Sequence, residues 1–130
     1  MTTKDDIIAE CLKMEGSFVD YPFTPTTAVI KTAKGKMFAF TDLAPADKIK
    51  KNCGADAPVE DGDIFLNLKC SPDLIEIFRA QYKSVLPGYY SSKAHWNTII
   101  VGKDVPHEEL IKMIRLSFEL VNGKKKQGVG

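Results

Sequence analysis

The segment 63–70 alternates in the way that a β-strand requires. One set of alternate positions is entirely apolar, and its members are Ile64, Leu66, Leu68 and Cys70. The other set holds Phe65, Asn67 and Lys69. Because successive side chains of a strand point to opposite faces of a sheet, we expect the first set to face a core and Asn67 and Lys69 to lie on an open face. The segment therefore predicts a sheet with one buried face.

Helix and turn signals around this strand predict an α+β fold. A capping box opens a helix near residue 3, a Ser-Pro-Asp start opens a second at residue 71, and a Pro-His-Glu-Glu start opens a third at residue 106. Further strands are predicted at 28–32, 36–41 and 95–101, with an extended arm near 86–90. The order, roughly α-β-β-β-α-β-β-α, is typical of a two-layer sandwich with helices on one face of an antiparallel sheet.

An aromatic segment at 18–25 contains two prolines, which exclude regular structure, so we predict a loop there. Its aromatic side chains are Phe18, Tyr21 and Phe23. Two interpretations stay open for this loop. It forms a lid packed over a sheet edge, or it forms one wall of a pocket.

The segment 43–62 is rich in proline, glycine and charged residues. Its few apolar anchors predict the most mobile internal segment of the chain. A short helix at 46–52 would carry Lys48, Lys50 and Lys51. These lysines form either a solvated face or a set of phosphate contacts.

The length of the chain indicates the number of its domains, and its charge bears on whether it binds nucleic acid. Its 130 residues fit one domain, which we assign to residues 1–123, followed by a Lys-rich tail at 124–130 that we predict to be flexible. The net charge is +1, and neither half of the chain is strongly basic. The basic stripe by which many nucleic-acid-binding proteins are known is therefore absent from the sequence.

Cysteine spacing and hydropathy give further limits. The three cysteines are scattered, with no Cys-x-x-Cys and no Cys/His cluster, so we expect no metal site. We also expect no cofactor and no catalytic residue in the chain, although Cys70, just before a predicted helix, is the one cysteine that could act as a nucleophile. The first residues lack the pattern of a signal peptide, and no apolar run approaches 18 residues. We therefore expect a cytoplasmic protein that does not associate with a membrane.

One stretch, 86–98, concentrates the chemically distinctive side chains. It contains the only tryptophan, one of two histidines and two of four tyrosines. Trp96 and His95 are neighbours on a predicted strand, so they point to opposite faces. We expect Trp96 to be buried against Phe78 or Phe118, and His95 to share the outer face with Asn97.

Several motifs carry a resemblance to the MmcQ/YjbR-like family. They are Pro-Gly-Tyr at 87–89, Lys-Ala-His-Trp-Asn-Thr at 93–98, Asn-Leu-Lys-Cys-Ser-Pro-Asp-Leu at 67–74, Asp-Val-Pro-His-Glu-Glu-Leu at 104–110 and Tyr-Pro-Phe at 21–23. The chain departs from the family in a longer 43–62 segment and in Tyr-Ser-Ser at 90–92, where a His-Met-Asn-like run is more usual. The resemblance implies a two-layer α/β fold of the kind shared with secretion chaperones and CyaY-like proteins. It also implies a bacterial cytosolic setting and the DNA-binding role that is proposed for the family, which is not associated with an established catalytic activity.

Three functions remain open on these grounds. The first is a non-enzymatic DNA-binding protein that uses the open sheet face with weak, sequence-independent affinity. The second is a protein-interaction module or homodimer that uses the wide apolar face of the last helix. The third is a small-molecule enzyme or binder with a pocket near His95, Tyr89 and Tyr90. The candidate contact residues are Lys93, His95, Asn97, Tyr89, Tyr90, Lys69 and Arg79.

Overall fold

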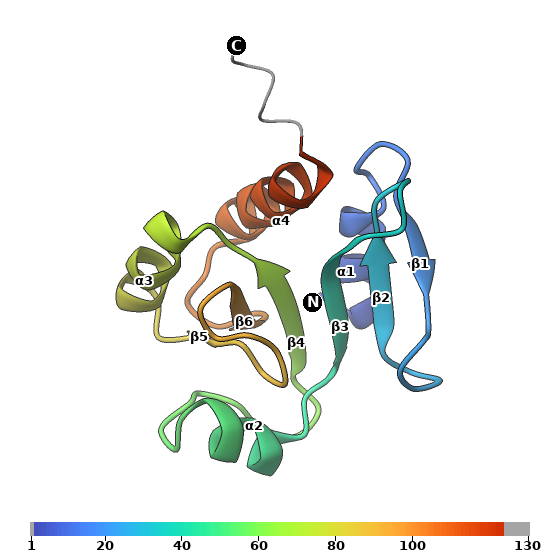
Figure 1. Ribbon diagram of the computed structural model, residues 1–130. Helices are drawn as coiled ribbons and strands as arrows, with labels where there is room; N and C mark the ends of the chain where they lie inside the picture. Colours follow the sequence, from blue (N-terminus) through green and yellow to red (C-terminus); the bar gives the residue numbers. More distant parts are fainter. Residues whose placement is uncertain (1, 124–130) are drawn as a thin grey trace.

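The computed structural model describes residues 2–123, in which a six-stranded antiparallel sheet carries four helices (Figure 1). The sheet order is β1-β2-β3-β4-β6-β5, and every neighbouring pair is antiparallel. The strands are β1 (Phe18–Asp20), β2 (Ala28–Lys31), β3 (Met37–Leu43), β4 (Ile64–Lys69), β5 (Val85–Pro87) and β6 (Trp96–Ile100). The helices are α1 (Lys4–Cys11), α2 (Ala46–Cys53), α3 (Pro72–Gln81) and α4 (His107–Asn122). The predicted α+β class is confirmed, whereas the tail at 124–130 lies outside the described residues.

The first core lies between the sheet and helices α1 and α4 (Figure 1). Ile64, Leu66 and Leu68 of β4 all point into it, as the alternation of this strand predicts. The hydroxyl of Ser117 on α4 donates to the carbonyl of Phe38 at 2.6 Å and accepts from the backbone N–H of Lys69 at 2.9 Å. These two bonds fix α4 against β3 and β4, and they satisfy polar groups that burial would otherwise leave unpaired.

A second apolar cluster covers the other face of the sheet, where we expected an open surface. Its members include four sheet residues and Ile49 of α2. The sheet residues are Val29, Phe40, Phe65 and Trp96. Asn67 is fully buried under this cover, so its predicted place on an open face is wrong. The sheet therefore has buried side chains on both faces, with α1 and α4 on one face and α2 with the 88–95 loop on the other.

The segment 43–62 provides most of this second cover. The predicted short helix is present as α2, and the segment has apolar anchors after all. Those that are buried are Ala44, Ala46, Ile49, Ala57 and Val59. Four of these five side chains are small and lie among charged residues, so the sequence has no clear apolar period. The prediction that the segment 43–62 is mobile assumed that it has few apolar anchors, and that assumption is wrong.

The segment 18–25 also differs from its prediction. Residues Phe18–Asp20 form β1, which pairs with β2 at the edge of the sheet. Both prolines come after this short strand, so they do not interfere with its hydrogen bonds. Residues 21–27 then form an exposed connection between β1 and β2.

No helix within residues 2–123 combines the length and the apolar character that crossing a membrane requires.

Candidate functional site

The structure does not bring Lys93, His95 and Asn97 together on one surface. His95 is exposed, and its Nδ1 lies 3.1 Å from the hydroxyl of Ser92. Asn97 is only 3% exposed and lies beneath α3, where its Oδ1 accepts a hydrogen bond from Arg79 at 2.7 Å. The prediction that Asn97 lies on an outer surface is therefore wrong. It shares a face of β6 with Ile99, and that face is covered by helices.

Trp96 is buried as predicted, at 9% exposure, but its neighbours differ from those expected. Its ring lies 5.9 Å from that of Phe40 in the second cluster, and neither Phe78 nor Phe118 belongs to that cluster. Because Asn97 faces the helices, Trp96 at the adjacent position must face the opposite side.

Arg79 holds the 93–97 segment to α3. Its guanidinium donates to the Asn97 side chain, to the carbonyl of Trp96 at 3.2 Å and to the carbonyl of Lys93. It also forms an ion pair with Glu76 at 3.3 Å, and its side chain is 16% exposed. With these partners the Arg79 guanidinium is engaged within the fold, and its role as a DNA or ligand contact stays a prediction.

Lys93 fastens the 88–95 loop to α2. Its Nζ donates to the carbonyl of Gly88 at 2.6 Å and to Oδ1 of Asn52 at 2.8 Å. The same Asn52 oxygen accepts from the backbone N–H of Tyr90 at 3.1 Å. The sequence analysis did not name Asn52 as a candidate residue, because only the lysines near it suggested a binding role.

A buried polar network sets the position of Tyr89. Asn67 donates to the carbonyl of Tyr89 at 2.9 Å, and Thr98 donates to Asn67 Oδ1 at 2.6 Å. The hydroxyl oxygen of Thr98 also accepts from the backbone N–H of Tyr89 at 2.7 Å. At Gly88 an added Cβ would lie 2.3 Å from Ser91 Oγ and 2.9 Å from Trp96 Cβ, so only glycine fits without rearrangement. The motif residues of this loop thus determine its shape.

The loop displays Tyr90, which is 71% exposed. Its φ is +52°, and Tyr90 is the one non-glycine residue between 2 and 123 with positive φ. This left-handed conformation is unfavourable for a bulky side chain and persists only where the surroundings impose it. The bond from the Tyr90 N–H to Asn52 and the bonds to Tyr89 provide that constraint.

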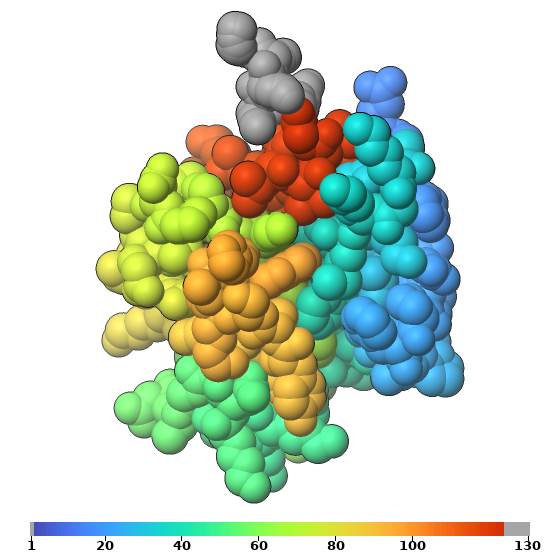
Figure 2. Space-filling model, viewed as in Figure 1, coloured from blue at the N-terminus to red at the C-terminus, as the bar shows by residue number. Residues whose placement is uncertain are grey.

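An open groove of about 550 Å³ lies next to Tyr90. Its aromatic residues form a continuous series in which successive ring centroids lie 6.1, 6.1, 5.3 and 4.5 Å apart, namely Phe23, Phe40, Phe65, Tyr89 and Tyr90. The three inner members are buried, while Phe23 at one end is 60% exposed. We call this series the aromatic floor. Figure 2 shows the blue atoms of the 21–27 connection, the green atoms of α2 and the orange atoms of the 88–95 loop, the segments that contribute to the groove.

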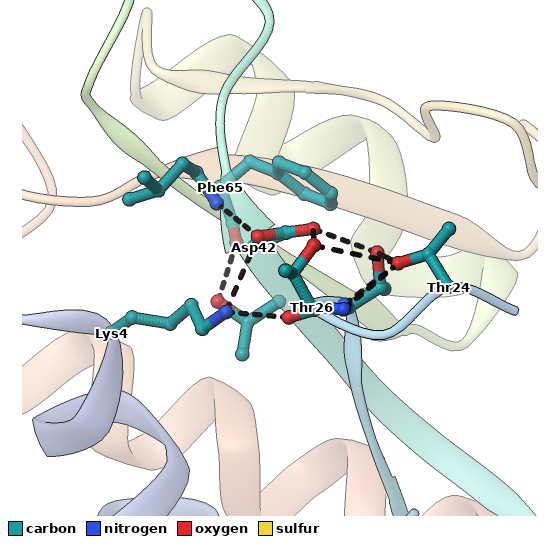
Figure 3. A network of polar contacts seen from close by, with 8 residues as sticks. Lys4, Thr24, Thr26, Asp42 and Phe65 are labelled. Atoms are coloured by element: carbon teal, nitrogen blue, oxygen red, sulfur yellow. Dashed lines mark hydrogen bonds and ion pairs between the residues drawn. The ribbon is translucent and has the colours of Figure 1, made fainter. Parts of the chain in front are cut away.

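Asp42 closes one side of this groove as a hydrogen-bonded clamp (Figure 3). Its Oδ2 accepts from the hydroxyls of Thr26 at 2.9 Å and Thr27 at 2.8 Å, and its Oδ1 lies 3.3 Å from Lys4 Nζ. Thr24 in turn accepts from the backbone N–H groups of Thr26 and Thr27 at 3.2 and 2.9 Å. The clamp holds the connection that carries Phe23 against β3.

Burial by itself raises the pKa of the Asp42 carboxyl, but hydrogen bonds outweigh this effect. The donors are Thr27, the Leu43 backbone N–H, Thr26 and Lys4, and together they hold the pKa of Asp42 below its ordinary value. A carboxylate with this many donors is favoured in its charged form.

The lowered pKa of Asp42 predicts acid-sensitive stability. The stability that this carboxylate contributes is complete above the unfolded-state pKa of about 4 and is lost as the pH falls through the lower folded-state pKa. We expect Asp42→Asn to lower the free energy of unfolding at pH 7 by about 1–3 kcal/mol and to reduce its further loss on acidification. Urea unfolding at pH 7 and at low pH measures both effects.

The exposed Asp56→Asn is the matched control, with an expected change of no more than about 0.5 kcal/mol at pH 7. Equal behaviour of the two variants would show that the clamp does not stabilise the fold.

A second hollow of about 300 Å³ adjoins the groove and shares Lys48 and Tyr90 with it. Its other residues are Lys51 and Asn52. Lys48 and Lys51 are exposed on α2, so their ammonium groups are accessible beside the groove. Lys69, by contrast, is the last residue of β4, lines a separate small cavity with Asn97 and Ile99, and lines neither of these two hollows.

The arrangement of possible metal ligands and the protonation of the thiols bear on the chemistry of the described residues. Within residues 2–123 no three His, Cys, Asp or Glu side chains gather where they could hold a metal ion. Burial raises the pKa of the Cys53 and Cys70 thiols, and it raises that of Cys11 to about 12. The neutral thiol is therefore favoured at each, which is unsuited to a nucleophile. What the surface offers is exposed ring faces beside two ammonium groups, an arrangement suited to binding.

Comparison with known proteins places the chain in a family. The model of the YjbR family matches residues 12–120. The uncharacterised protein YyaQ of Bacillus subtilis is 31% identical over 124 residues, which are 92% of this chain and 98% of that protein. A crystal structure of the Deinococcus radiodurans protein DR2400, with the domain DUF419, superposes with a TM-score of 0.74 at 31% identity and covers 96% of this chain and 82% of that one. A Pseudomonas syringae protein shares the fold, with a TM-score of 0.76 at 22% identity over 92% of this chain and 99% of that one.

Proposed function

This chain belongs to the YjbR family, and we propose that it is a non-enzymatic DNA-binding protein whose contact surface is the groove together with α2. The observation that carries the proposal is the position of Lys48 and Lys51 beside exposed aromatic rings on one surface. Lysine ammonium groups bind phosphates, and aromatic faces bind bases. The resemblance to a family for which a DNA-binding role has been proposed supports the same function.

The contact surface differs from the one that the sequence predicted. Lys93 and Arg79 are held by internal hydrogen bonds, and Asn97 is buried. These three residues support the loop that carries Tyr90. In this proposal Tyr90 remains from the original candidates, and the α2 lysines replace the others as phosphate contacts.

The charge of the chain predicts weak binding. With a net charge of +1 and the acidic Asp47 directly before Lys48 on α2, few phosphates can be neutralised. For about two to three contacts, counterion release gives a log-log salt slope of roughly −2 to −3 and a dissociation constant of about 10⁻⁴–10⁻⁶ M at physiological salt. Sequence preference should be small, because contacts to phosphates do not distinguish bases.

Fluorescence anisotropy with labelled DNA at several salt concentrations tests the proposal. We expect the double variant Lys48→Ala, Lys51→Ala to weaken binding to a similar extent for all sequences and to reduce the salt slope by about 2. Lys112→Ala is the matched control for loss of an exposed lysine, since Lys112 lies on α4 across the sheet, and we expect it to leave the slope unchanged.

Absence of binding at high micromolar protein and low salt would remove DNA from consideration. Binding that the double variant does not weaken would place the contact surface elsewhere.

A further inference from the structure

Tyr90 presents one free ring face to solvent. Its other face rests on Tyr89, with centroids 4.5 Å apart and an interplanar angle of 29°. With 71% of the residue exposed, the outer face can accept a further planar group that continues the stack.

The structure holds Tyr90 in this position at an energetic cost. A left-handed backbone, with φ at +52°, would be relieved by glycine or asparagine at the same site. The hydrogen bond that the Tyr90 backbone N–H donates to Asn52 Oδ1 and the buried Asn67 network impose it nevertheless. An unfavourable backbone that displays an exposed aromatic ring points to a binding role for that ring.

The groove offers ring faces in preference to hydrogen-bonding groups. Asp42 and the hydroxyls of Thr24 and Thr27 are bonded to one another or to Thr26 and Lys4. A ligand that needs specific donors and acceptors would have to break this clamp. A ligand that stacks would not, and Phe23 gives it a second exposed ring at the far end of the aromatic floor.

Positive charge lies beside the stack. Lys48 lines both hollows together with Tyr90, and Lys51 lines the second. A planar group on Tyr90 with an attached phosphate would therefore find an ammonium group nearby. The ring faces of bases are accessible in unpaired strands and are covered by neighbouring bases within a duplex.

We propose that the groove binds unpaired bases of single-stranded DNA, which stack on Tyr90 and Phe23 while their phosphates contact Lys48 and Lys51. This inference rests on the proposed function, and it adds a preference for single-stranded DNA over duplex DNA. Because every base has a ring face, the groove should bind different sequences with similar affinity.

Anisotropy of one labelled oligonucleotide, measured alone and annealed to its complement, tests the inference. We expect tighter binding of the single strand. We also expect Tyr90→Ala to weaken single-strand binding about 5- to 150-fold, as loss of one stacked base does. Phe23→Ala should act in the same direction. The control Tyr90→Phe keeps the ring and should bind like the unmodified protein.

The outcomes separate this inference from the proposed function. Equal affinity for single strand and duplex, with no effect of Tyr90→Ala, overturns the inference and leaves DNA binding intact. Absence of binding to either form overturns both. Thymidine monophosphate is added as a competitor, because a free nucleotide offers the same base and phosphate. Binding of the monophosphate without binding of the oligonucleotide would assign the groove to free nucleotides and overturn the strand proposal.

Thermal unfolding of Tyr90→Gly provides a second measurement. The glycine relieves the left-handed backbone, so we expect a melting temperature at or above that of the unmodified protein together with weakened single-strand binding. A variant that loses binding only because it unfolds would contradict the inference.

Discussion

Trp96→Ala is expected to lower the free energy of unfolding by about 3–5 kcal/mol. The side chain is 9% exposed and packs against Phe40 in the cluster that covers the second face of the sheet. Its removal takes away buried apolar contacts and leaves a cavity that neighbouring side chains fill only in part. Loss of tryptophan removes the only indole signal, so unfolding is followed by circular dichroism in guanidinium chloride.

His95→Ala, one residue away, is the control for the Trp96 measurement. His95 is exposed and its side chain contacts Ser92, so we expect a change below about 1 kcal/mol. A similarly small change for Trp96→Ala would mean that the second cluster adds little to stability and that Trp96 is available for binding.

Arg79→Ala is expected to cost about 2–3 kcal/mol, because it leaves the buried Asn97 side chain and two backbone carbonyls without their donor. Arg79→Lys should lose most of the same stability, since an ammonium group cannot reproduce the fork of the guanidinium. Chemical denaturation of both variants measures these effects.

The variant Arg79→Lys distinguishes a role of Arg79 in stabilising the fold from a role in contacting DNA. If Arg79 acted through its charge, Arg79→Lys would keep both stability and salt slope. We expect it to be destabilised and to keep the salt slope. Full stability with a reduced slope would restore Arg79 to the contact surface.

The sequence was sufficient to predict the fold class and the first core. The alternation of β4 correctly placed Ile64, Leu66 and Leu68 in the first core, and the helix start signals located three helices. The second core was missed because its cover comes from a segment of charged residues and small side chains such as Ala46 and Ala57. Side chains of that size produce no recognisable period, and their burial depends on contacts made after folding.

The candidate site was predicted in part. The sequence indicated Tyr90 and one interpretation of the 18–25 segment as a pocket wall, and Phe23 does line the groove. The differences concern Asn97, whose polar side chain suggested exposure but is buried, and Lys93, which is exposed but whose ammonium group binds within the chain. Their partners, Arg79 and Asn52, are 18 and 41 positions away, and no local pattern reveals a pairing over such distances.

Chemical-shift mapping by NMR tests most directly whether the groove and α2 are the DNA-binding surface. Titration of the ¹⁵N-labelled protein with short single-stranded DNA should shift backbone signals at 21–27, 46–53 and 89–91 and leave those of α4 unchanged. Shifts confined to α4, or no shifts at high micromolar DNA and low salt, would contradict the account.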